Sequence, residues 1–165
     1  YLCFFGTHVG DAGASAIAAA LGRGALPRLK SLQLANAAIG DAGLVALAPA
    51  LRRRPALERI SLTGNPFGDE GLTALVAPPP LPVKAPLPTC VLTKLKQLRL
   101  SNTQVTDAGC AAFASALGSG ALPALERSPD LGGTPASPAA KQAVHSAYGT
   151  ARGRRLAEYF GGSEW

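Results

Sequence analysis

The sequence is poor in aromatic residues, charged residues and cysteine, and each shortage narrows the class of protein. Aromatic residues make up 5% of the 165 residues and charged residues 16%, whereas 47% are hydrophobic, mostly leucine and alanine. This composition favours thin, regular layers over a bulky globular centre. Cys3, Cys90 and Cys110 are odd in number and have no repeated spacing, which argues against a disulfide framework and a zinc site. We therefore expect reduced thiols and a cytoplasmic protein.

Long hydrophobic runs are also missing. The longest candidate, residues 14–21, is broken by Ser15 and followed by Gly22 and Arg23, and it is far shorter than the roughly 20 apolar residues of a membrane span. The sequence has no initiator Met and no basic start followed by an apolar stretch, so it contains no recognisable signal peptide. We expect no association with a membrane, and we expect the sequence to be a piece of a longer protein.

The net charge of +6 is spread along the chain instead of being focused on one element. The dense basic runs are residues 52–54 and 152–155. A nucleic-acid binder usually gathers its basic residues on one element with aromatic residues between them. We interpret both runs as solvated loop charge, and nucleic-acid binding through a basic rim is the weaker alternative.

Four copies of one unit line up along the chain. The second copy is the clearest, with Leu29, Leu32 and Leu34 in the order Leu-x-x-Leu-x-Leu, then Ile-Gly-Asp-Ala-Gly at residues 39–43. The hydrophobic residue that leads into the Asp-x-Gly step recurs at spacings of 30, 28 and 38 residues, at Val9, Ile39, Phe67 and Val105. A fifth copy, with Pro138 in place of the aspartate, is typical of a worn terminal cap.

Each unit combines the period of a strand with the period of a helix. The Leu-x-x-Leu-x-Leu segment alternates at period two, whereas Leu44, Leu47 and Leu51 fall at helical spacing. A single unit cannot bury both apolar faces, but stacked units can. The sequence therefore predicts an α/β solenoid in which the strands form a parallel β-sheet and the helices form an outer layer.

One aspartate per unit stands where the helix is expected to begin. A carboxylate there can accept backbone N–H bonds and interact with the positive end of the helix dipole. We predict helix capping, and not metal binding, for this column: Asp11, Asp41, Asp69 and Asp107.

The pattern LxxLxLxxNxIGDxGxxxLAxAL resembles the leucine-rich repeat of the ribonuclease-inhibitor type. The resemblance implies a horseshoe-shaped solenoid with the parallel β-sheet on the concave face and the helices on the convex face. It covers residues 1–121 well, as four repeats with a truncated first copy and a Pro-rich insertion at 77–88, and residues 122–148 loosely. We expect 122–148 to be a degenerate terminal repeat that ends in a helix from about Ala139 to Tyr148. Residues 149–165 are expected to form a C-terminal tail that either docks on the last repeat or stays mobile, and the Ala, Pro and Gly bias of residues 129–140 favours weak order there.

The column that holds an asparagine in this family departs from the pattern. The asparagine is present as Asn65, whereas Thr7, Ala37 and Thr103 occupy the matching positions. Threonine can partly replace the side-chain hydrogen bonds of asparagine, but alanine cannot. We therefore expect either an array that is looser than a typical member of the family or turns that are shifted by one residue, since Asn36 and Asn102 fall one residue early.

Residues between the strand leucines are expected to point to the concave side, free of a role in the core. Aromatic and arginine side chains are the usual anchors of interfaces. The candidate partner-binding residues on this face are Tyr1, Phe5, Gln33, Arg59, Ser61, Gln97, Arg99 and Ser101. A neighbouring column alternates in charge and is predicted to hold the register of the sheet by lateral attraction: Lys30, Glu58, Lys96 and Glu126.

These features predict a protein-interaction scaffold with no catalytic activity, no cofactor and no metal. Neither His8 nor His145 is accompanied by serine, cysteine or carboxylate residues in a repeated arrangement. The resemblance implies two alternatives, a regulator of an enzyme (a GTPase activator or a ribonuclease inhibitor) and the sensor array of an innate immune receptor. The segment Pro79–Lys84 matches the ligand pattern of SH3-type domains, although a passive inserted loop is the simpler interpretation.

Overall fold

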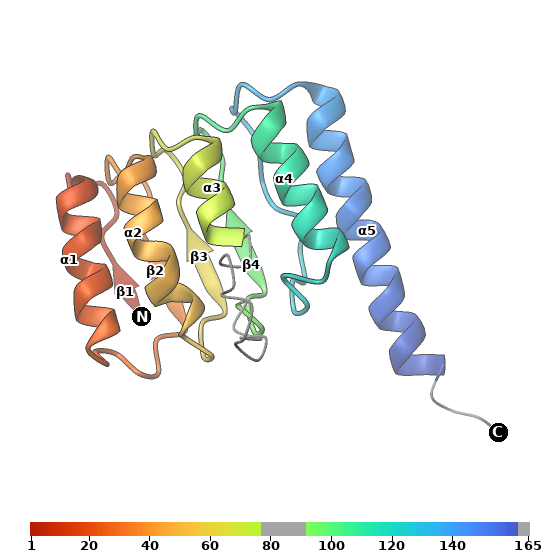
Figure 1. Ribbon diagram of the computed structural model, residues 1–165, viewed down its shortest axis with the longest axis horizontal. Helices are drawn as coiled ribbons and strands as arrows, with labels where there is room; N and C mark the ends of the chain where they lie inside the picture. Colours follow the sequence, from red (N-terminus) through yellow and green to blue (C-terminus); the bar gives the residue numbers. More distant parts are fainter. Residues whose placement is uncertain (77–91, 162–165) are drawn as a thin grey trace, which may run out of the picture.

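Strands and helices alternate along the chain (Figure 1) in the computed structural model, which describes residues 1–76 and 92–161. The strands are β1 (Leu2–Cys3), β2 (Ser31–Gln33), β3 (Arg59–Ser61) and β4 (Gln97–Arg99). The helices are α1 (Gly10–Gly22), α2 (Asp41–Arg52), α3 (Asp69–Val76), α4 (Asp107–Gly118) and α5 (Pro138–Gly161). The insertion at 77–88, with the SH3-type pattern Pro79–Lys84, lies outside the described residues.

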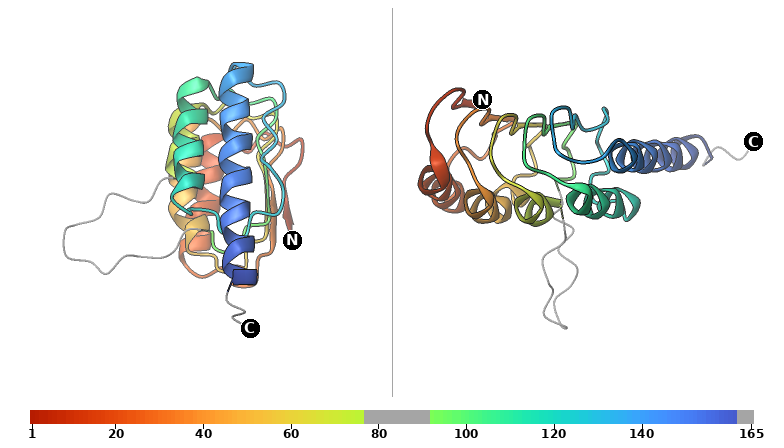
Figure 2. Two further views of the ribbon diagram at one scale, coloured as in Figure 1. Left: turned by 90° about the vertical axis from the view of Figure 1, so that its right-hand side faces the viewer. Right: turned by 90° about the horizontal axis from the view of Figure 1, so that it is seen from above.

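The four strands form one parallel sheet in the order in which they follow each other in the sequence. Leu32 pairs with Ile60, and Ile60 pairs with Leu98. Figure 2 shows the strands on one side of the molecule and α1 to α4 in a row on the other. The predicted α/β solenoid, a leucine-rich-repeat horseshoe with its sheet on the concave face, is confirmed.

The last leucine of each strand segment forms a continuous apolar row between the two layers. Leu34, Leu62 and Leu100 are each fully buried. Their amides donate in turn to the next repeat, to the carbonyls of Ser61 (2.9 Å), Arg99 (3.0 Å) and Asp130 (3.0 Å). The row therefore holds successive repeats together through side-chain packing and backbone hydrogen bonds at the same place.

Asn65 stands at the asparagine position of the family pattern and closes the turn of the preceding repeat at Ala37. Its side chain is 1% exposed, and its Oδ1 accepts from the amides of Ala37 (3.1 Å) and Ile39 (3.0 Å). Its Nδ2 donates to the carbonyls of Leu34 (2.6 Å) and Leu62 (2.8 Å). These bonds serve the turn of the preceding repeat, so an asparagine at position 37 would have served the turn of the first repeat, and the expectation of a looser array or of shifted turns stays a prediction.

The aspartate column caps helices, but each aspartate caps the helix of the next repeat and not its own. Asp41 Oδ1 accepts from the amides of Gly68 (2.9 Å) and Gly71 (2.7 Å), at the start of α3. The other members act alike: Asp11 accepts from Gly40 (2.6 Å), Asp69 from Thr106 (2.7 Å) and Asp107 from Ser137 (2.5 Å). We call this series the aspartate relay.

The relay also explains the glycine of the Asp-x-Gly step. A Cβ placed on Gly71 would lie 2.9 Å from Asp41 Oδ1 and 3.2 Å from atoms of Leu44. A side chain there would push the carboxylate away from the amides that it binds. The aspartate of one repeat and the glycine of the next are therefore one structural unit.

Helix α5 is longer than the sequence suggested. It was expected to end near Tyr148, with a tail from residue 149, but it continues to Gly161. Val144 is fully buried and Tyr148 is 9% exposed, and Tyr148 Oη donates to the carbonyl of Glu126 (2.5 Å). Helix α5 packs on α4. It is displaced from the row of the other helices toward the sheet (Figure 2), so it covers the end of the leucine core.

Candidate functional site

The open face of the sheet presents the residues that alternate with the buried strand residues, and we call it the concave face. The register places Ser31, Arg59 and Gln97 in one row across β2, β3 and β4. A second row contains Gln33, Ser61 and Arg99. Because the strands are parallel and in register, residues far apart in sequence become lateral neighbours, roughly 4.8 Å apart between adjacent strands.

Seven of the eight predicted face residues, all except Ser101, fall into two groups. Arg59, Ser61, Gln97 and Arg99 border a common depression together with Gln33. Tyr1 (84% exposed) and Phe5 (64% exposed) lie at the β1 edge of the sheet, and they do not line that depression. Tyr1 and Phe5 are therefore separate from the residues that border the depression.

Ser101 belongs to the rim of the face. It follows β4, is half-buried, and its side chain interacts with Asp130 of the next repeat. The pKa of Asp130 lies below its ordinary value, because the Ser101 side chain and the Gly132 amide (3.0 Å) donate hydrogen bonds to its carboxylate and because Arg99 attracts the negative charge. Asp130 was not among the predicted residues.

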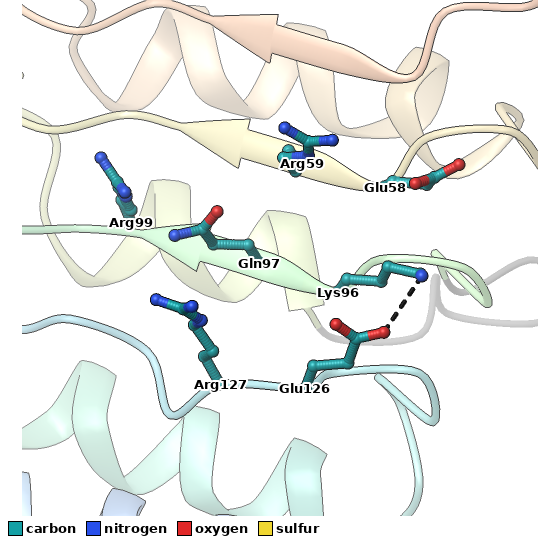
Figure 3. Close-up of a pocket in the computed structure, with 7 residues that line it drawn as sticks. All are labelled: Glu58, Arg59, Lys96, Gln97, Arg99, Glu126 and Arg127. Atoms are coloured by element: carbon teal, nitrogen blue, oxygen red, sulfur yellow. Dashed lines mark ion pairs between the residues drawn. The ribbon is translucent and has the colours of Figure 1, made fainter.

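A larger hollow of about 400 Å³ lies over β3, β4 and the segment that follows α4 (Figure 3). It is open to solvent, and its lining is polar and charged. Its lining residues are Glu58, Arg59, Lys96, Gln97, Arg99, Glu126 and Arg127. We call it the arginine hollow.

Arg127 was missed by the sequence reasoning. Glu126 N donates to the carbonyl of Lys96 (3.0 Å), as Lys96 N does to Glu58 (2.8 Å), so the ladder of the sheet continues past β4. Arg127 is therefore the lateral neighbour of Gln97, just as Gln97 is the lateral neighbour of Arg59. A signal was present in the sequence, because Glu126 was already aligned with Lys30, Glu58 and Lys96.

The alternating charges of the neighbouring column are arranged as two ion pairs. Lys30 Nζ lies 3.9 Å from Glu58 Oε1, and Lys96 Nζ lies 3.0 Å from Glu126 Oε1. The hydrogen bond from Lys96 to Glu126, and then the charge of that carboxylate, raises the pKa of Lys96. Lateral attraction between neighbouring strands is confirmed for these two pairs.

The arginines of the hollow belong to neither pair. Across residues 1–76 and 92–161 the ion pairs are Lys30–Glu58 and Lys96–Glu126. With its amide oxygen facing Arg99, Gln97 accepts hydrogen bonds from Nη2 (3.1 Å) and Nε (3.0 Å) of that arginine. The hollow therefore carries positive charge that the described part of the chain does not neutralise by pairing.

The described residues give no sign of a metal site or a membrane span. Within residues 1–76 and 92–161, no three histidine, cysteine, aspartate or glutamate side chains come together in a way that could hold a metal ion. In the same ranges, no helix has the length and apolar character needed to cross a bilayer.

Comparison with known proteins identifies the repeats. The sequence pattern of the Leucine Rich repeat family matches residues 26–48, 55–76 and 91–114, which coincide with the second, third and fourth units described above. The chain is a leucine-rich-repeat protein. Its repeats are of the ribonuclease-inhibitor type, since the chain is 32% identical over 117 residues to the ribonuclease inhibitor of Sus scrofa.

The alignment with the ribonuclease inhibitor covers 70% of this leucine-rich-repeat chain and 23% of the relative. The chain thus spans about a quarter of the length of the curated protein that it matches. Both comparisons support a binding scaffold built from repeats.

Proposed function

We propose that this leucine-rich-repeat array is a protein-interaction scaffold that binds a folded partner through the concave face. The observation that supports the proposal is the row of polar and charged side chains from adjacent strands on a sheet face that no helix of the described chain covers. Five side chains lie side by side there: Gln33, Arg59 and Arg99 are exposed, and Ser61 and Gln97 are half-buried. Such a surface offers many hydrogen-bonding groups to a rigid partner with little rearrangement of its own.

The same face supports the proposal that the chain has no catalytic role. The groups that border the arginine hollow are arginine, lysine, glutamine and glutamate, and the glutamates are engaged with lysines. His145 lies outside the hollow, on α5, where its Nδ1 contacts Ser128 Oγ at 2.5 Å.

A second candidate function is regulation of an enzyme by covering part of its surface. The similarity to a ribonuclease inhibitor favours it. In this form of the proposal the partner is itself an enzyme, and inhibition of a purified ribonuclease by the chain is the assay that distinguishes the two.

We also infer that the protein works in the cytoplasm. Cys3 is an exposed free thiol and Cys110 a buried one, a state that a reducing compartment maintains. Fractionation of cells that produce the tagged chain tests this location, and recovery in an oxidising compartment would contradict it.

The test of the scaffold proposal blocks the concave face without changing its charge. Gln33→Tyr with Ser61→Tyr fills the depression between β2 and β3, while Val45→Tyr with Ala111→Tyr adds the same bulk to exposed positions of α2 and α4. We expect chemical cross-linking in cell extract to retain a partner on the unaltered chain and on the helix-face variant, but not on the concave-face variant. Retention by all three chains would contradict the proposal.

A further inference from the structure

We propose that the arginine hollow binds an acidic segment of the protein partner, with neighbouring carboxylates of that segment held by Arg59, Arg99 and Arg127. This inference rests on the proposed function and adds the chemistry of the partner. It follows from three features of the hollow: unpaired guanidinium groups, their spacing, and the carboxylates at its border.

The first feature is the division of charge inside the hollow. Glu126 is held by Lys96 at 3.0 Å and Glu58 by Lys30 at 3.9 Å. Asp130 beside Arg99 is engaged by Ser101 and by the Gly132 amide. The acidic groups near the arginines thus already have partners of their own. The exposed guanidinium groups retain N–H donors that can bind a carboxylate in a bidentate arrangement.

The second feature is the geometry of the three arginines. Arg59 and Arg127 stand two strand spacings apart across the sheet, roughly 10 Å. Arg99 lies on the strand between them, two residues further along β4 than Gln97, a step of about 7 Å. Alternate side chains of an extended peptide are separated by the same step of about 7 Å, so an extended segment with acidic residues at alternate positions can reach more than one arginine.

Gln97 contributes to this geometry by fixing Arg99. With its side-chain amide turned so that the oxygen faces Arg99, Gln97 accepts from both Nη2 and Nε of that arginine, and the other edge of the guanidinium plane is left to a ligand. A side chain that is already oriented loses less conformational entropy on binding. Figure 3 shows Arg99 and Arg127 projecting over the same part of the hollow, whereas the Lys96–Glu126 pair lies at its other end.

The third feature favours a protein segment over a nucleic acid. A phosphate backbone carries charge continuously and needs a basic track to follow, but Glu58, Glu126 and Asp130 border the arginines. The lining also contains no aromatic residue on which bases could stack. A short cluster of carboxylates fits a small positive area enclosed by negative charge better than a long polyanion does.

The experiment measures binding of two labelled probes of equal length, an oligoglutamate and an oligouridylate, by fluorescence anisotropy. It compares the unaltered chain with the triple variant Arg59→Gln, Arg99→Gln and Arg127→Gln. A matched control, Arg28→Gln, Arg53→Gln and Arg152→Gln, removes the same charge from exposed positions away from the concave face. Circular dichroism and thermal unfolding establish that all three chains are folded.

We expect the oligoglutamate to bind the unaltered chain more tightly than the oligouridylate. The triple variant of the hollow should weaken oligoglutamate binding by about tenfold or more, and the control by about twofold or less, because charge-assisted hydrogen bonds are lost only in the first. Equal weakening by both variants, tighter binding of the oligouridylate, or no binding of the oligoglutamate would each overturn the inference.

The blocking variants of the concave face separate this inference from the proposed function. If cross-linking to a partner is abolished by Gln33→Tyr with Ser61→Tyr but is unaffected by the arginine variant, the scaffold function stands and the acidic segment is wrong. If cross-linking survives the blocking variant, the scaffold function itself is wrong.

Discussion

Asn65 satisfies buried backbone groups of two repeats at once, and its loss is expected to destabilise the array strongly. Asn65→Ala leaves the amides of Ala37 and Ile39 and the carbonyls of Leu34 and Leu62 without this partner. We expect the free energy of unfolding to fall by about 2–4 kcal/mol, the usual range for several unsatisfied buried groups. Urea denaturation monitored by circular dichroism measures the change.

The control for this prediction is Asn36→Gly. Asn36 is exposed and has a φ of 53°, a backbone conformation that glycine adopts without strain. We expect a change of about 0.5 kcal/mol or less. If both variants lost the same stability, the hydrogen bonds of Asn65 would not be the cause.

At the scale of residues, the sequence predicts which side chains are buried better than it predicts their partners. Alternation along each strand placed Leu34 and Leu62 in the core and Arg59 on the concave face, because a strand has two faces and only one is covered. The partners of Asn65 and Asp41 could not be read in this way. They lie in neighbouring repeats, and an aligned column does not reveal toward which neighbour a side chain turns.

The aspartate relay makes the start of each helix depend on the preceding repeat. Asp41→Ala removes the acceptor of the Gly68 and Gly71 amides at the start of α3. We expect a loss of about 1–2 kcal/mol, as for other helix caps, and faster hydrogen exchange in the first turn of α3. Glu70→Ala is the matched control, since Glu70 is an exposed carboxylate in the same turn; an equal effect there would argue for the helix dipole alone.

The relay and the rim of the concave face also predict loss of stability in acid. The Ser137 hydrogen bonds hold the pKa of Asp107 below its ordinary value, and those of Ser101 and Gly132 do the same for the pKa of Asp130. A carboxylate with a lowered pKa in the folded state stabilises the fold above the unfolded value of about 3.9. This contribution is lost as the pH falls through the lower, folded value.

Asp107→Asn with Asp130→Asn tests the acid dependence. We expect the decrease in Tm below about pH 4 to be shallower in this variant than in the unaltered chain, because neither asparagine titrates. Glu70→Gln removes one exposed carboxylate and serves as the reference. Identical acid profiles for the variant and the unaltered chain would count against the two carboxylates as its source.

Element boundaries were predicted well where the leucine pattern is regular and poorly where it stops. Helices α2 and α4 begin at the aspartates of the second and fourth units. In α5, Gly149 and Gly153 weaken the helical signal, and the extension to Gly161 was therefore not predicted. Arg127 was missed because positions on the concave face were assigned in the four regular units alone, although the adjacent Glu126 was aligned with the charged column.

At the scale of the molecule, each unit within residues 1–76 and 92–161 packs on its neighbours in sequence: the helix contacts there run α1–α2, α2–α3, α3–α4 and α4–α5. A defect at one end should therefore remain local. Val144→Asp places a charge in a fully buried position of α5. We expect it to lower the free energy of unfolding by about 3 kcal/mol or more. We expect hydrogen exchange to increase in α5 and α4 while α1 and α2 stay protected.

Ala143→Asp controls for the added charge, because Ala143 is exposed on the same helix. Hydrogen-exchange mass spectrometry follows both variants helix by helix. A uniform loss of protection from α1 to α5 would show that the array unfolds as a single cooperative unit.

The aspartate relay gives the array a polarity that matches its synthesis. A chain leaves the ribosome from its N-terminus, and early units can fold before later ones exist. When the segment of α2 emerges, Asp11 is already in place to receive the Gly40 amide, and the same holds for Asp41 and α3. Each aspartate thus precedes in the chain the helix start that it caps, and the order of these contacts runs in the direction of translation.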